Sequence, residues 1–168
     1  MPAGYLGTKR MGELAELAFM YRAASEGIGV ARPYGDSHPY DFLVQHGRKL
    51  LRVQVKSCFT PHRSGFPISV CRDVGKEKGL LYSQEDVDFI AAYVAPHQAW
   101  YLIPIESLKR TKTVRLYPGG INLRSTPFYE TYRDAWHLLK QQENTEIAEL
   151  KEEVKLIVEK SAVQLPIV

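Results

Sequence analysis

The strongest constraint on the fold lies in residues 40–57, YDFLVQHGRKLLRVQVKS, where two largely apolar runs flank the polar tetrapeptide HGRK at residues 46–49. A glycine in a short polar turn between two such runs is typical of a β-hairpin. The sequence therefore predicts one strand over residues 40–45 and a second over residues 50–58.

The second strand of this hairpin divides its side chains between two environments. Because strand side chains repeat every two residues, the apolar set lies on one face and the polar pair on the other: Leu51, Val53 and Val55 against Gln54 and Lys56. A strand with one solvated face alternates in the same way, so this pattern alone leaves a purely structural role open.

The remaining elements follow from periodicity and turn residues. Thr8 is the expected N-cap of a helix over residues 9–25 that Gly27 ends, with an apolar stripe at Leu14, Leu17, Ala18 and Tyr21. Further strands are expected over residues 66–72, 87–94, 99–105 and 113–117, with a turn at 75–79 and a helix over 127–142. This order predicts an α/β protein with a mixed central β-sheet flanked by helices.

The chain has 168 residues, which favours a single main domain over residues 1–142 and a charged helical tail over 143–168. The tail carries an apolar stripe that either packs on its own domain or joins subunits: Ile147, Leu150, Val154 and Ile157. Two cysteines are too few for a disulfide framework, and no apolar run reaches the roughly 20 residues of a membrane span. We therefore expect a cytoplasmic protein with no membrane contact.

Charge is unevenly distributed along the chain. Residues 1–80 contain 12 Lys or Arg against 7 Asp or Glu, whereas residues 81–168 contain 10 against 12. A basic half is compatible with a polyanionic partner such as nucleic acid, although most lysines on most proteins are solvated surface.

The hairpin also places an acid beside its polar face, because Asp41 lies at the start of the first strand. Carboxylate, amide and main-chain carbonyl oxygens are the ligands that a hard divalent cation prefers, and an adjacent lysine stabilises developing phosphate charge. Together, Asp41, Gln54 and Lys56 have the chemistry for phosphodiester hydrolysis.

A further carboxylate comes from the first helix. Glu16 has Phe19 and Met20 as its i+3 and i+4 neighbours, so it does not lie on a plainly solvated face and needs a partner. That partner is either a metal ion or a basic group such as Lys9 or Arg10. Glu13, one turn earlier, is an alternative or additional ligand.

These residues resemble the PD-(D/E)XK nuclease superfamily, in which a helix glutamate, a strand aspartate and a (D/E/Q)-x-K strand build a magnesium site. The resemblance rests on Gly12, Glu16, Asp41 and the run Gln54-Val55-Lys56-Ser57, with two later apolar runs like the closing strands of the family. It is strongest to the QxK homing endonucleases associated with group I introns and weaker to archaeal-type Holliday junction resolvases. Two departures are Tyr40 in place of the motif proline and Gln54 in place of the usual acid.

The resemblance implies a restriction-endonuclease-like core and a role for each residue. Asp41, Glu16, the Gln54 side chain and the Val55 carbonyl would hold Mg²⁺, with Mn²⁺ as a substitute. Lys56 would position the attacking water, and Glu13 and Ser57 would support the ligands. Hydrolysis would leave 5′-phosphate and 3′-hydroxyl ends on DNA.

Double-stranded DNA is the implied partner, and a long target or a double-strand break implies a homodimer or homotetramer. The candidate DNA-contacting residues precede the first helix or lie on turns and strand ends of the basic half: Lys9, Arg10, Arg48, Lys49, Arg63, Arg72, Lys76 and Lys78. The expected function is a magnesium-dependent DNA endonuclease of the homing type. The alternatives are a Holliday junction resolvase and a nuclease-like fold that binds DNA without cleaving it.

Overall fold

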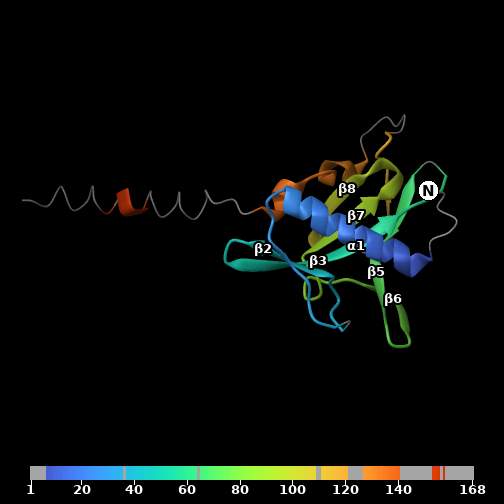
Figure 1. The fold of residues 1–168 in the computed structure, drawn as a ribbon, viewed down its shortest axis with the longest axis horizontal. Coiled ribbons are helices and arrows are strands. Elements are labelled where there is room, and N and C mark those ends of the chain that lie inside the picture. The colour runs from blue at the N-terminus through green and yellow to red at the C-terminus, as the bar shows by residue number, and fades with distance from the viewer. Residues whose placement is uncertain are drawn as a thin grey trace, which may run out of the picture.

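Five strands of the computed structural model form one mixed sheet in the order β1-β2-β3-β7-β8. The structure describes residues 7–35, 37–63, 65–108, 111–120, 127–140, 153–155 and 157. The bounds of these strands are Val30–Ala31 for β1, Phe42–His46 for β2, Lys49–Cys58 for β3, Phe89–Val94 for β7 and Ala99–Pro104 for β8. Helix α1, Thr8–Ser25, lies across the sheet (Figure 1). The predicted α/β architecture is therefore confirmed.

The predicted hairpin is present as β2 and β3. His46 pairs with Lys49, so the loop contains only Gly47 and Arg48, and Gly47 has a φ of +63°. A left-handed residue at the first loop position matches the strand twist, and glycine adopts this conformation without steric cost. The turn thus fixes the register that pairs Phe42 with Val53.

Strand β3 lies at the centre of the sheet. It pairs antiparallel with β2 on one side and parallel with β7 on the other, where Gln54 faces Ile90 and Lys56 faces Ala92 in register. Strand β2 pairs with β3 only as far as Val53, so β7 alone holds the backbone at positions 54 and 56 as a strand partner. On the other edge, the Val55 N–H donates to the Asp41 carboxylate.

Helix α1 packs on one face of the sheet through small and aromatic residues. Ala15, Phe19 and Ala23, spaced by four, are its buried residues, and the Phe19 ring lies 5.2 Å from Phe42 and 5.7 Å from Trp100. These side chains join Val53 and Val55 of β3 in one core cluster.

Two details of the predicted helix are wrong. The expected apolar stripe faces solvent, with Leu17 62% and Tyr21 77% exposed, because a close approach to the sheet selects the alanine face instead. Thr8 lies inside the helix and Gly7 is the N-cap, without a side-chain hydrogen bond.

A second core lies on the opposite face of the sheet. Strands β4, Phe66–Ser69, and β9, Thr113–Leu116, pair antiparallel and cover Ile90, Tyr101 and Ile103. The short 3₁₀ helices η2, Ala95–His97, and η3, Ile105–Ser107, follow β7 and β8. The sheet is thus covered on both faces, by α1 on one and by the β4–β9 pair on the other.

The strand predicted over residues 66–72 is in fact two strands in different sheets. It breaks at Val70, whose N–H donates to the Lys112 carbonyl, and continues as β5, Cys71–Val74. Strand β5 forms a hairpin with β6, Glu77–Leu81, that projects from the body (Figure 1). The sequence revealed only its turn, because both strands are largely polar and solvent-exposed.

The helix predicted over residues 127–142 is also wrong within the described residues 127–140. Two 3₁₀ helices, η4 at Phe128–Tyr132 and η5 at Trp136–Leu139, replace it. Between them Arg133 bridges to Tyr101 of β8, and the Asp134 N–H donates to the Trp100 carbonyl at 2.7 Å. Asp134 has a φ of +48°, which an α-helix does not allow. The segment therefore caps the outer edge of β8.

The predicted tail helix falls mostly outside the described residues. Glu153–Lys155 and Ile157 are helical where the structure describes them. None of the helices in the described part of the chain has the length and apolar character that would span a membrane.

The corrected helix face gives a stability prediction. Phe19→Ala is expected to lower the free energy of unfolding by about 3–5 kcal/mol, because it empties the centre of the aromatic cluster. The matched variant Leu17→Ala removes a side chain that is 62% exposed and is expected to change stability by less than about 0.5 kcal/mol. Urea unfolding followed by circular dichroism measures both, and equal losses would contradict the assigned buried face.

Candidate active site

Asp41, Gln54 and Val55 meet at the open end of the β2–β3 hairpin. The Asp41 N–H donates to the Val53 carbonyl at 3.0 Å, which extends the ladder by one residue beyond β2. The Asp41 carboxylate then turns back toward β3, where Oδ2 accepts hydrogen bonds from Val55 N at 2.7 Å and from Gln54 Nε2 at 2.5 Å. The structure thus brings the predicted acid and amide into direct contact.

The side-chain amide nitrogen of Gln54 lies between two oxygen atoms where a cation could bind. As placed, its Nε2 donates both to Asp41 Oδ2 and to the Val55 carbonyl at 3.1 Å. Two of the expected metal ligands are therefore occupied by one amide NH₂ group. Turning this amide by half a turn exchanges Nε2 for Oε1, which then presents an oxygen beside the same two acceptors.

Glu16 reaches the same site from α1. Its Oε2 is shielded from solvent and lies 2.9 Å from Arg32 Nη2, an ion pair by distance whose angles do not make a hydrogen bond. A basic group therefore lies beside Glu16, and it is Arg32 rather than Lys9 or Arg10. The Arg32 side chain is 63% exposed, so this pair is only partly shielded.

Burial shapes the electrostatics of the two central groups. It raises the pKa of Asp41 to about 6, against the opposing effect of the Val55 hydrogen bond, and the Glu16 charge adds to the rise. Burial lowers the pKa of Lys56, although Asp41, Cys71 and Asp73 favour its charged form. Both pKa shifts favour the uncharged form of the side chain. Such shifts of an acid and a base in one site are characteristic of functional positions.

The donor set fits a hard divalent cation. Two carboxylates, one amide oxygen and one main-chain carbonyl are available from Glu16, Asp41, Gln54 and Val55. Glu16 Oε2 is a buried oxygen to which no group in the described part of the chain donates a hydrogen bond. Among the residues that the structure describes, no group of three or more His, Cys, Asp or Glu could hold a metal. Any metal here would depend on the amide and the carbonyl as well as on the carboxylates.

Glu13 and Ser57, the two residues predicted to support the ligands, make no side-chain hydrogen bond or ion pair with Asp41, Gln54 or Lys56 within the described part of the chain. Glu13 is exposed, one turn before Glu16. Ser57 follows the alternation of Val53 and Val55, so it lies on the α1 side of β3 rather than beside Lys56. Their supporting roles stay predictions.

Three residues near the site had no signal in the sequence: Arg32, Tyr82 and Asp86. Arg32 lies just after β1, and Tyr82 follows β6 in a segment without periodicity. The Lys56 ammonium lies over the Tyr82 ring, 5.3 Å from its centroid. Only the tertiary fold brings these side chains close to the candidate site on β3.

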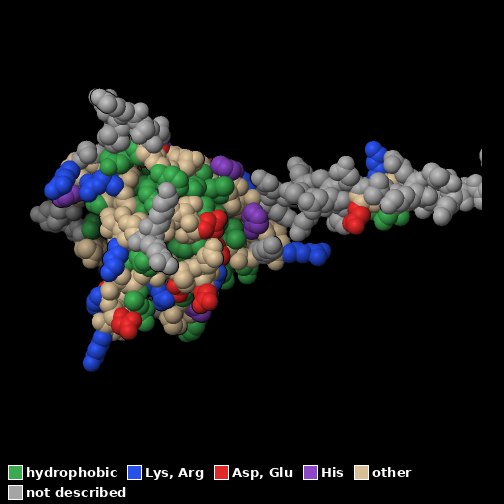
Figure 2. Space-filling model, turned by 180° about the vertical axis from the view of Figure 1, so that it is seen from behind, with side chains coloured by type: hydrophobic (Ala, Val, Ile, Leu, Met, Phe, Trp, Pro, Cys, Tyr) green, Lys and Arg blue, Asp and Glu red, His purple; other side chains and the backbone are tan. Residues whose placement is uncertain are grey.

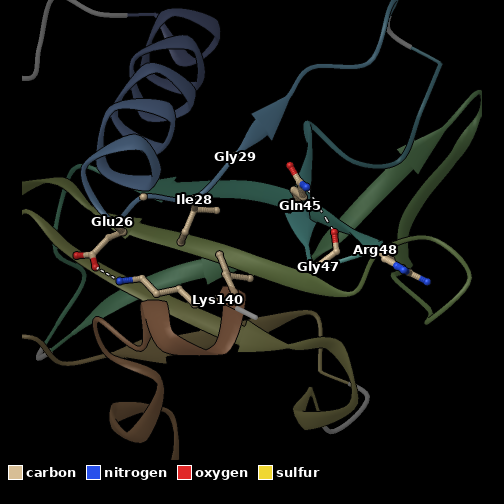
Figure 3. Close-up of a pocket in the computed structure, with 9 residues that line it drawn as sticks. Glu26, Ile28, Gly29, Gln45, Gly47, Arg48 and Lys140 are labelled. Carbon is tan, nitrogen blue, oxygen red and sulfur yellow. Dashed lines mark hydrogen bonds and ion pairs between the residues drawn. The ribbon is translucent and has the colours of Figure 1, made fainter. Parts of the chain in front are cut away.

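A cavity of about 440 Å³ lies elsewhere, at the C-terminal end of α1. Glu26, Gln45, Arg48 and Lys140 are among its lining residues, and Glu26 is already neutralised by Lys140 at 2.7 Å (Figure 3). No residue of the Asp41 site lines this cavity, so its size does not make it the active site.

The raised pKa of Asp41 predicts how stability depends on pH. The folded state holds this proton up to about pH 6, whereas the reference value is 3.8, so the ionised carboxylate destabilises the fold at higher pH. Asp41→Asn is therefore expected to stabilise the metal-free protein by roughly 1–3 kcal/mol at pH 8. The gain should shrink as the pH falls through 6 and vanish below about 4, where both states carry the proton.

Asp73→Asn is the matched control, because the hydrogen bond from the Gly79 N–H and the contact with Lys78 lower the pKa of Asp73. That variant should lose stability at pH 8 rather than gain it. Thermal unfolding of both variants at pH 4, 6 and 8, without metal, shows whether each substitution raises or lowers stability. A gain from Asp41→Asn that is equal at pH 4 and pH 8 would contradict the assignment.

The chain is similar to proteins of known structure. The chain is similar to a bacterial homing endonuclease, I-Ssp6803I, with 27% identity and a TM-score of 0.68 over 95% of this chain and 98% of that one. It is also similar to Hjc, a Holliday junction resolvase from Archaeoglobus fulgidus, with 21% identity and a TM-score of 0.43 over 66% of this chain and 90% of that one. No curated protein matched the chain. The family profile described as PD-(D/E)XK endonuclease matches residues 6–139, and the chain therefore belongs to the PD-(D/E)XK endonuclease family.

Proposed function

We propose that this endonuclease cleaves double-stranded DNA in a metal-dependent reaction and acts as a site-specific enzyme of the homing type. The observation that carries the proposal is the convergence of Asp41, Gln54 and Glu16 beside the half-buried Lys56. The likeness to a homing endonuclease over nearly the whole length of both chains supports the homing type.

Glu16, Asp41, the Gln54 side-chain oxygen and the Val55 carbonyl would hold Mg²⁺, or Mn²⁺ in its place. The bound cation supplies Lewis-acid polarisation of the scissile phosphate. Because Gln54 is neutral, Asp41 and Glu16 carry all of the negative charge in this donor set. Asp41 must also be ionised to serve, so the affinity of the site for the cation should weaken as the pH falls below about 6.

Lys56 has two tasks in this proposal. Its ammonium stabilises the negative charge that develops on the phosphate, and it orients a water molecule for in-line attack. Burial lowers the pKa of Lys56, which eases the movement of a proton between its nitrogen and that water. The products would carry 5′-phosphate and 3′-hydroxyl ends.

DNA contacts are proposed for the exposed basic residues of the first half of the chain: Lys9, Arg10, Arg48, Arg63, Lys76 and Lys78. Lys and Arg side chains are spaced along one edge of the molecule, down to the tip of the β5–β6 hairpin (Figure 2). Arg72 is half-buried and paired with Asp86 at 2.5 Å, and its contact with DNA stays a prediction. The side chain of Lys49 lies outside the described residues and stays a prediction.

A double-strand cut requires two active sites, so we also propose a symmetric homodimer or homotetramer. The apolar stripe of the tail, residues 143–168, is the proposed contact between subunits. Residues 1–142 would then form the nuclease domain of each subunit.

Lys56→Met tests the chemistry directly, because methionine keeps the apolar stem and removes the ammonium. Cleavage of a random-sequence duplex pool with Mg²⁺ or Mn²⁺ is expected to fall at least about 100-fold, while DNA binding is retained. Lys140→Met, which removes an exposed lysine at the distant cavity, is the matched control and should cleave normally. Full cleavage by Lys56→Met would contradict the proposed role.

The same assay separates the alternatives. A strong preference for a four-way junction over linear duplex would identify a junction resolvase. Bound but uncut DNA, in both metals, would favour a nuclease-like fold that only binds DNA.

Metal affinity gives a test that does not depend on finding the target site. Mn²⁺ binding, measured by calorimetry, should be weakened at least about tenfold by Asp41→Asn and by Glu16→Gln. Glu77→Gln is the control, because Glu77 is exposed on β6 and is not among the proposed ligands. Unchanged Mn²⁺ binding in Asp41→Asn would exclude the proposed metal site.

A further inference from the structure

Lys56 has one specific contact in the structure, and that contact is aromatic. Within the described residues, no hydrogen bond or ion pair involves its ammonium group, whereas Nζ lies over the face of Tyr82, 5.3 Å from the ring centroid. A lysine side chain loses considerable rotamer freedom when it is held in one position, so a contact that holds it beforehand lowers the cost of ordering it for reaction. The negative face of an aromatic ring attracts a cation at this distance.

Other neighbouring residues hold Tyr82 in place. The Arg72 guanidinium also lies over the ring, with its central carbon 5.9 Å from the centroid. Arg72 is paired with Asp86 at 2.5 Å, and Asp86 Oδ2 accepts hydrogen bonds from Ser83 N and Ser83 Oγ, both at 2.9 Å. The residue that follows Tyr82 is thereby tied to the same acid that fixes Arg72.

This arrangement connects the β5–β6 hairpin with the central strand of the sheet. Arg72 belongs to β5, Tyr82 follows β6, and Lys56 belongs to the central strand β3. The base of the projecting hairpin therefore forms one wall of the catalytic site, built from an aromatic ring rather than from a hydrogen-bonding side chain.

We propose that Tyr82 is a positioning residue for the reaction, whose ring face holds the Lys56 ammonium in place for the scissile phosphate. The proposal deepens the nuclease function and rests on it. The ring face is the active feature, and the hydroxyl group is not required. Arg72 and Asp86 act indirectly, because they hold the Tyr82 ring and not Lys56 itself.

The test uses Tyr82→Leu, which removes the ring and keeps an apolar side chain, and Tyr82→Phe, which keeps the ring and removes the hydroxyl. At saturating DNA, Tyr82→Leu should lower the single-turnover cleavage rate roughly tenfold, with DNA affinity unchanged. Tyr82→Phe should recover most of that loss. Thermal unfolding of both variants checks that the fold is intact.

A second measurement is independent of cleavage. A proton held over a ring face resonates upfield, so NMR should show upfield-shifted ε-methylene signals of Lys56 in the wild-type protein without metal or DNA. Lys56→Met identifies these signals by their absence. The shift should persist in Tyr82→Phe and disappear in Tyr82→Leu.

The outcomes separate this inference from the nuclease function. Unshifted Lys56 signals in the wild type, cleavage by Tyr82→Leu at the wild-type rate, or equal losses in both variants would each overturn it. Shifted signals in a protein that cuts no DNA would count against the nuclease function instead, and would leave the contact between Tyr82 and Lys56 established.

Discussion

The hydrogen bonds along both edges of β3 are the constraint on which the rest of the site depends. One edge pairs with β2 and the other with β7, so the strand cannot slip without turning Val53 and Val55 out of the core. The same ladder positions the acid, because the Asp41 N–H bonds to the Val53 carbonyl and the side chain then returns to Val55 N. Core packing on one face thus determines the geometry of the candidate site on the other.

The central part of this arrangement could be predicted from the sequence, since it is local. The Gly47 turn, the alternation along β3 and the order of acid, amide and lysine all lie within residues 40–57. The parallel partner β7 was also found, because a strand buried on both sides is a continuous apolar run. These features follow from residues that are close together in the chain.

The misses have a common physical cause, which is that tertiary contacts override local periodicity. The aromatic spacing in residues 127–140 is helical, yet the Arg133 and Asp134 backbone pairs with β8 instead. The predicted buried stripe of α1 was wrong because alanine, rather than leucine, permits close approach of the helix to the sheet. Arg32 and Tyr82 reach the site only through the fold, from segments whose local sequence carries no such information.

The bridge between Arg133 and Tyr101 has a consequence for how subunits could meet. A sheet whose outer strand is free can grow by adding a strand from another chain. Here β8 is capped by the Arg133–Asp134 backbone, and the other outer strand of the five-stranded sheet, β1, is only two residues long. Assembly by a continuous sheet across two subunits is therefore disfavoured, and an oligomer of this endonuclease would have to be joined through side-chain surfaces.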